Sequence, residues 1–166
     1  MKQRLLSVLV LLVVVATLGF ASNGDTINIG GLVPLRLELT VVVDGSEVNL
    51  DLTGGTVAFS PTIADITIST NSSAGWGLWV FAVNAVGTDT AMINADLDAI
   101  PYTISYSDGA ANGVTGASIP VTTGVEIANR DDDVGSTGQL SITYTQNPDY
   151  PAGYYSDQLA IVLRAK

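Results

Sequence analysis

The chain lacks two residue types on which many enzymes and small exported domains depend: its 166 residues include no cysteine and no histidine. Histidine-containing catalytic triads, thiol catalysis and zinc sites with Cys or His ligands therefore have no residues to use. A glycosidase-type pair of carboxylates is conceivable, but sequence spacing does not set the distance between two carboxylates. We predict that the chain is not an enzyme and binds no cofactor. Without disulfides, apolar burial and hydrogen bonds between strands must hold the fold together.

Positive charge and aromatic residues are also scarce. The chain has six Lys and Arg residues and sixteen Asp and Glu residues, which gives a net charge of −10, and aromatic residues make up 7% of it. Nucleic acid and anionic lipid surfaces are therefore poor partners. Apolar residues make up 47%, many of them β-branched, which favours a folded chain over a disordered one.

Long apolar runs are confined to the start of the chain. Residues 1–21 combine Lys2 and Arg4 with an apolar stretch and small residues before Ser22, the pattern of a cleaved secretory signal peptide. A membrane anchor is the alternative, although Leu5 to Ala21 is short for a membrane span. Cleavage leaves one domain, 22–166, with a net charge of −12 because two cations are lost. We predict secretion to the periplasm or cell surface, without membrane insertion after cleavage.

The stretch from Ile63 to Val83 carries the strongest strand signal. Ile66 and Ile68 alternate with polar residues, which is typical of a half-buried strand. Residues 71–75, Asn-Ser-Ser-Ala-Gly, favour a turn. The following arm is apolar on both faces, so one face can line a core while the other needs a partner. We predict a central hairpin.

Further alternating segments are separated by turn signals every ten residues or so. This pattern predicts an all-β fold, an antiparallel β-sandwich of roughly seven to nine strands, with a closed barrel as the alternative. The segment Ala91 to Leu97 fits one helical turn or a short strand. The other expected strands are Thr26–Gly30, Pro34–Val43, Glu47–Thr53 (returning from a turn at Asp44-Gly45), Thr56–Ser60, Pro101–Tyr106, Gly113–Thr122, Val125–Ala128, Gln139–Thr145 and Gly153–Arg164.

Candidate binding residues are few. Trp79 and Phe81, with the tyrosines of residues 150–155, could stack on sugars or anchor a protein partner if exposed. Burying a tryptophan is worth about 5 kcal/mol as an upper figure, so we favour coverage of both rings by this chain or by a neighbour. The acidic run 129–135 does not match an EF-hand, which leaves open an irregular calcium site at Asp131 and Asp133.

The C-terminal segment 150–163 resembles the closing strand of the spore coat protein U and archaic chaperone-usher pilin families. The matching positions are Pro151, Ala152, Gly153, Tyr155 and Asp157. The resemblance implies an incomplete immunoglobulin-like sandwich that is completed by a strand from another subunit.

The same resemblance implies that Thr26–Leu32, within residues 22–33, is the donated strand, with Ile27 and Ile29 pointing one way. The Gly30-Gly31 pair equally allows this segment to fold back onto its own sheet. An unpaired sheet edge beside an apolar groove is a template for strand addition.

Two functions are consistent with these observations. The preferred prediction is a secreted, non-enzymatic structural subunit of a bacterial surface or fimbria-like assembly, with other subunits or its own copies as partners. The alternative is a secreted module that binds carbohydrate or cell wall through its aromatic side chains.

Overall fold

The computed structural model describes residues 32–45, 49–86, 89–109, 113–120 and 123–166. Contacts divide the chain into two units, residues 1–33 and residues 34–166. The predicted signal peptide, 1–21, and the predicted strand Thr26–Gly30, with Ile27 and Ile29, lie outside the described residues. All the strands of the described residues belong to the second unit.

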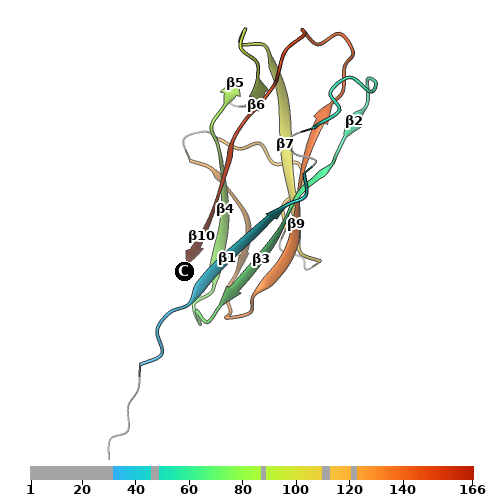
Figure 1. Cartoon of the computed structure of the whole chain (residues 1–166). Helices are drawn as coiled ribbons and strands as arrows, with labels where there is room; N and C mark the ends of the chain where they lie inside the picture. Colours follow the sequence, from blue (N-terminus) through green and yellow to red (C-terminus); the bar gives the residue numbers. More distant parts are fainter. Residues whose placement is uncertain (1–31, 46–48, 87–88, 110–112, 121–122) are drawn as a thin grey trace, which may run out of the picture. The chain divides into compact units, whose positions relative to one another are not determined.

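All regular structure in the described residues is β-strand, which confirms the all-β prediction, with ten strands rather than seven to nine (Figure 1). Two of these, β2 and β5, are only two residues long. The strands are β1 (Leu37–Val43), β2 (Ala58–Phe59), β3 (Thr62–Thr70), β4 (Trp76–Ala82), β5 (Ala85–Val86), β6 (Asp89–Ile93), β7 (Ala99–Ser107), β8 (Val125–Arg130), β9 (Ser136–Thr145) and β10 (Leu159–Ala165).

The strands form two antiparallel sheets. The larger sheet has the order β1-β3-β9-β7-β6-β5, with β2 pairing the end of β9. The smaller sheet has the order β10-β4-β8. The first strand, β1, therefore lies at an edge of the larger sheet, and the last strand, β10, lies at an edge of the smaller one.

Apolar side chains from both sheets form a single core. Ile66 of β3, Ile104 of β7 and Leu140 of β9 come from the larger sheet, and Trp76 and Leu78 from β4 of the smaller one; all are almost completely buried. The period-two alternation puts every second residue of each strand on this inner face. The two sheets are held together by burial of these side chains.

The connection between β3 and β4 corrects the predicted central hairpin. The two strands do not pair, because β3 pairs with β1 and β9 whereas β4 pairs with β10 and β8. Residues 71–75 therefore carry the chain from one sheet to the other. Gly75 is required there, since its φ is +90° and an added Cβ would lie 2.0 Å from the carbonyl oxygen of Arg130.

Three other strand predictions are corrected. Residues 49–53 form no strand: the backbone carbonyl of Asp51 accepts hydrogen bonds from the side chains of Tyr144 and Gln146, which hold this segment as a loop. Of the described residues in 113–122, only Ala117 makes a β-bridge, with Ile104. The last strand begins at Leu159 rather than Gly153. The undecided segment from Ala91 to Leu97 ends the strand β6 and then forms a turn.

Candidate functional site

The candidate site is a groove between the two edge strands β1 and β10. In the described part of the chain, β1 pairs only with β3, and β10 pairs only with β4. Each strand thus has a second edge whose backbone N–H and C=O groups are not used by a neighbouring strand of the described residues. Such edges recruit further strands unless they are covered.

The inner face of β1 becomes more exposed toward the end of the strand. Leu37 and Leu39 are partly buried and pack against the core, whereas Val41 is 37% exposed and Val43 is 61% exposed. All four side chains lie on the same side of the strand, since they are two residues apart. The groove therefore opens in the direction of Val43.

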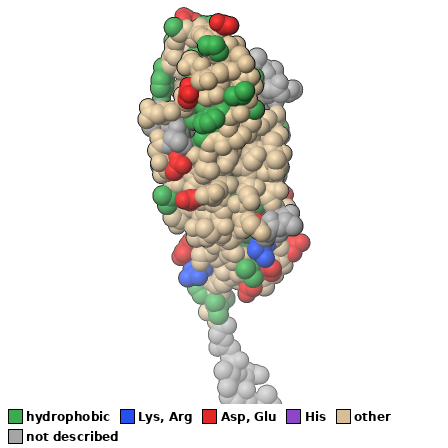
Figure 2. Space-filling model, turned by 90° about the vertical axis from the view of Figure 1, so that its right-hand side faces the viewer, with side chains coloured by type: hydrophobic (Ala, Val, Ile, Leu, Met, Phe, Trp, Pro, Cys, Tyr) green, Lys and Arg blue, Asp and Glu red, His purple; other side chains and the backbone are tan. Residues whose placement is uncertain are grey.

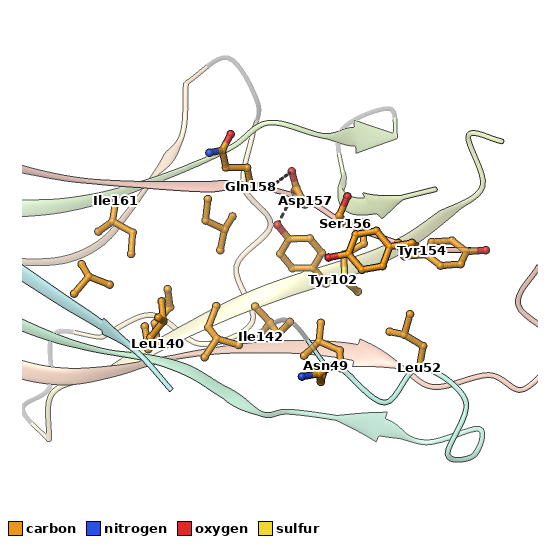
Figure 3. A pocket seen from close by; sticks show the side chains of 18 of the residues that line it. Asn49, Leu52, Tyr102, Leu140, Ile142, Tyr154, Ser156, Asp157, Gln158 and Ile161 are labelled. Atoms are coloured by element: carbon orange, nitrogen blue, oxygen red, sulfur yellow. Dashed lines mark hydrogen bonds between the residues drawn. The ribbon is translucent and has the colours of Figure 1, made fainter. Parts of the chain in front are cut away.

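The open part of the groove encloses a cavity of about 640 Å³. Figure 3 shows Leu140 and Ile142 on one side of it and Ile161 on the other. Most of the wall is apolar, and Asp157 is the one charged side chain among the described residues that line it. The apolar lining comprises Val41, Val43, Leu50, Leu52, Ile63, Ala64, Met92, Tyr102, Leu140, Ile142, Tyr154, Tyr155, Leu159 and Ile161.

Asp157, in the wall of the groove, accepts three hydrogen bonds. Its Oδ2 accepts from the hydroxyl of Tyr102 at 2.7 Å (Figure 3). Its Oδ1 accepts from the backbone N–H groups of Asn84 at 2.9 Å and Gln158 at 2.7 Å. A carboxylate whose oxygens all have donors is satisfied without a bound cation. The charge therefore belongs to the framework of the groove rather than being free for a ligand.

Burial, together with the hydrogen bond to Asp157, raises the pKa of Tyr102 far above its ordinary value. Burial also raises the pKa values of Tyr106 and Tyr144. The unfolded chain loses these tyrosine protons near pH 10, whereas the folded chain retains them. The stability that depends on them is complete below about pH 10 and is lost as the pH rises further.

We therefore expect the free energy of unfolding to stay level from pH 7 to about pH 9 and to fall above about pH 10. Urea unfolding followed at a series of pH values measures it. Tyr102→Phe should lower stability at pH 7, since the hydrogen bond is lost, but should also make the alkaline fall less steep. A free energy of unfolding that is constant or rising up to about pH 11 would contradict this account.

Of the predicted aromatic residues, Tyr154 and Tyr155 line the groove, whereas Trp79 and Phe81 lie on the other face of the smaller sheet. Trp79 and Phe81 are half-buried, and the guanidinium of Arg164 lies 5.1 Å from the centre of the Trp79 ring and 5.6 Å from that of Phe81. Gly124 leaves room for Phe81, since an added Cβ would lie 2.6 Å from that ring. We predicted that this chain or a neighbour covers the Trp79 and Phe81 rings, and Arg164 of this chain covers part of them.

Two carboxylates of the acidic run at residues 131–133 pair with cationic side chains. Asp131 forms an ion pair with Lys166, and Asp132 forms one with Arg130 at 3.2 Å. On the face shown in Figure 2, Lys and Arg side chains lie close to acidic ones and form no basic patch among the described residues. In the described part of the chain, no group of three or more acidic residues is placed to hold a metal ion. The described ranges also contain no helix long and apolar enough to cross a membrane.

The sequence did not predict that Tyr102, Val41 and Val43 line one groove. Tyr102 was assigned to a strand, and Val41 and Val43 to another, but no pattern showed that these strands flank an opening. Asp157 did carry a signal, because it is one of the motif positions in segment 150–163. The predicted interface residues Ile27 and Ile29 lie outside the described residues, so the structure places neither of them.

No protein-family model matches the chain, and no curated protein matches it. Among solved structures, it is similar to a family 123 glycoside hydrolase from Clostridium perfringens that hydrolyses glycolipid glycans, with 14% identity and a TM-score of 0.39. The match covers 77% of this chain and 24% of that enzyme, so the chain spans about a quarter of its length. At this TM-score the likeness carries no argument about activity, and the absence of enzymatic activity stays a prediction.

Proposed function

We propose that the protein is a secreted structural subunit of a bacterial surface or fimbria-like assembly, in which Thr26–Leu32 of one copy enters the groove of the next. On this proposal the fold is an immunoglobulin-like sandwich that lacks one edge strand. The carrying observation is the groove itself, an apolar cavity of about 640 Å³ between two strands that each have a free edge in the described part of the chain.

The chemistry of the predicted donor segment suits this groove. In an extended segment Ile27 and Ile29 point to one side, and Thr26 and Asn28 to the other. The isoleucines can then occupy the apolar cavity while the backbone bonds to β1 and β10. Each isoleucine side chain moved from water into the groove contributes about 1.5–3 kcal/mol.

A cavity of this size also falls in the range of small-molecule sites, about 300–1,000 Å³. A small apolar ligand would fill the space between the walls but would leave both strand edges without hydrogen-bond partners. A strand can place apolar side chains against the walls and also form backbone hydrogen bonds with the strand edges. This favours a peptide segment as the occupant.

The start of β1 argues for donation to another copy rather than within one chain. Asn71 binds the segment before β1, since its side chain accepts a hydrogen bond from the N–H of Arg36 at 2.6 Å and donates one to the carbonyl of Pro34 at 2.9 Å. The N–H of Asn71 also donates to the carbonyl of Arg36 at 3.2 Å. These bonds continue the line of β1 back to Pro34, so a reversal of the chain has to come before that residue.

The number of residues before Pro34 determines which of them such a reversal would place beside β1. The tightest hairpin, with a two-residue loop at Leu32 and Val33, pairs Gly31 with Pro34 and therefore Gly24 with Val41. A longer loop moves the pairing still further toward the N-terminus. Ile27 would then lie beside Glu38, short of the open cavity at Val41 and Val43. A second copy has no such restriction, which favours exchange between chains.

A single cysteine tests this proposal, because the chain contains no other. Val43→Cys places a thiol on the inner face of β1, and Val42→Cys places one on the opposite face with nearly the same exposure, 58% against 61%. We expect a synthetic peptide of residues 26–33 to slow the reaction of the cysteine at position 43 with a thiol reagent, and to leave position 42 unaffected.

The control is the same peptide with aspartate at positions 27 and 29, which should give no protection. Protection of position 43 that is present without peptide and independent of protein concentration would instead indicate donation within one chain. Equal labelling of position 43 with and without the peptide would remove strand donation from the proposal. The carbohydrate alternative stays a prediction; retention of polysaccharide by the parent protein but not by Trp79→Ala would favour it.

A further inference from the structure

Asp157 connects the two sheets at the open end of the groove. The Tyr102 hydroxyl that donates to its Oδ2 belongs to β7 in the larger sheet. The Asn84 N–H that donates to its Oδ1 lies in the connection from β4 of the smaller sheet to β5 of the larger one, and the carbonyl of Gln158, the residue after Asp157, accepts from the N–H of Val83 directly after β4. One half-buried carboxylate therefore joins a side chain of the larger sheet to the segment that leads into β10 of the smaller sheet. Figure 3 shows the Tyr102 ring reaching from one layer toward Asp157 in the other.

The residue before Asp157 is tied to the larger sheet as well. Ser156 and Ile93 exchange two backbone hydrogen bonds, of 3.0 and 3.2 Å, at the end of β6. Three residues later, Leu159 pairs with Ala82 of β4 in the smaller sheet. The chain thus crosses from one sheet to the other over residues 156–159, and these residues all line the cavity.

This connection forms part of the wall of the cavity. Tyr102, Asp157 and Leu159 line the cavity together with Val43, the most exposed inner residue of β1. At the opposite end, Leu37 and Leu39 of β1 and Leu163 of β10 pack against the core and do not line the cavity. The cavity thus lies at the end of the groove where the Tyr102–Asp157 hydrogen bond is found.

An empty apolar groove tends to close, because bringing its walls together removes apolar surface from water. Hydrogen bonds, unlike apolar contacts, fix the distance and direction between the groups they join. We infer that Tyr102 and Asp157 are positioning residues, a strut that holds the groove open for an incoming strand. The inference rests on the proposed function, since it identifies the residues that keep the same groove open for the donated strand.

Thiol labelling tests the strut in the full chain. The labelling rate of Val43→Cys is proportional to the fraction of molecules in which the groove is open. We expect Tyr102→Phe to lower this rate by about fivefold, the change produced by a small shift between an open and a closed state. Val42→Cys in the same background should label at an unchanged rate, because its side chain lies on the other face of β1.

Two further variants separate the strut from a general loss of stability. Thr90→Val removes two hydrogen bonds of another buried hydroxyl, one donated to the carbonyl of Ile119 at 3.0 Å and one accepted from the N–H of Ile119 at 2.7 Å, and neither residue lines the groove. It should not slow labelling at position 43. Asp157→Asn should restore labelling relative to Asp157→Ala, since the amide oxygen accepts from backbone N–H and the amide N–H can donate to Tyr102.

The outcomes distinguish this inference from the proposed function. Equal labelling of position 43 with and without the Tyr102→Phe substitution, or equal slowing by Thr90→Val, would overturn the strut. Binding of the 26–33 peptide is measured separately: its association rate should fall in Tyr102→Phe by the same factor as labelling, with the dissociation rate unchanged. A peptide that binds neither protein would refute strand donation, while the labelling rates would still decide whether the strut exists.

Discussion

Replacing both Ile27 and Ile29 by aspartate is expected to abolish association between copies of this chain while leaving each copy folded. The physical reason is that these side chains would enter an apolar cavity in which Asp157 is the one charged group among the described residues and already accepts three hydrogen bonds. Losing two buried isoleucines costs about 3–6 kcal/mol of association free energy, a factor of roughly 10²–10⁴ in affinity. Burying two unpaired carboxylates would weaken binding further.

Sedimentation velocity and electron microscopy of the purified chain measure this effect. The matched control is the double variant Thr26→Asp and Asn28→Asp, which adds the same charge to the other side of the extended segment. That variant should assemble like the parent. If the two double variants assembled equally well, or if the parent itself were monomeric at every concentration, the assembly proposal would fail.

The largest effect on stability is expected from Trp76→Ala. Trp76 is completely buried in the core, and its indole N–H donates to the carbonyl of Val134 at 2.9 Å. Truncating a buried tryptophan typically costs about 3–5 kcal/mol, a large share of the roughly 5–15 kcal/mol that stabilises a domain. The loss of the hydrogen bond adds to this cost because the Val134 carbonyl loses its partner.

Trp79→Ala is the natural comparison, since the two tryptophans are three residues apart in one strand. Trp79 is half-buried on the outer face and contacts Arg164, so its truncation should cost only about 1–2 kcal/mol. Urea unfolding followed by far-UV circular dichroism measures both, and each variant keeps one tryptophan as a fluorescent probe. Equal losses in the two variants would show that the faces of β4 have been assigned wrongly.

The contrast between these two residues also shows what local sequence reasoning can achieve. Period-two alternation assigned Trp76, Leu78 and Val80 to one face of a strand and Trp79 and Phe81 to the other, and the first set is buried in the core. The prediction succeeded because the direction of a side chain in a strand depends only on its position in that strand. The all-β class followed from the same pattern, repeated along the chain.

The partner of a strand could not be predicted in this way. The turn after β3 reads equally well as a hairpin or as a crossing between sheets, and residues 71–75 make the crossing. The segment Glu47–Thr53 alternates like a strand, yet its described part is a loop held by the side chains of Tyr144 and Gln146. In both cases the outcome depends on residues far away in the chain, because those residues supply the hydrogen-bond partners of the segment.

The sequence by itself determined that this chain builds sheets without thiols or metal-binding histidines, and which side of the main strands faces inward, because these properties belong to single residues and their spacing. Only the tertiary structure decided that β1 and β10 come to lie at the edges of two different sheets, with an apolar groove between them and Asp157 spanning it. The reason is physical: an edge is defined by the absence of a neighbour, and strands distant in the sequence become neighbours or fail to do so only when the whole domain folds.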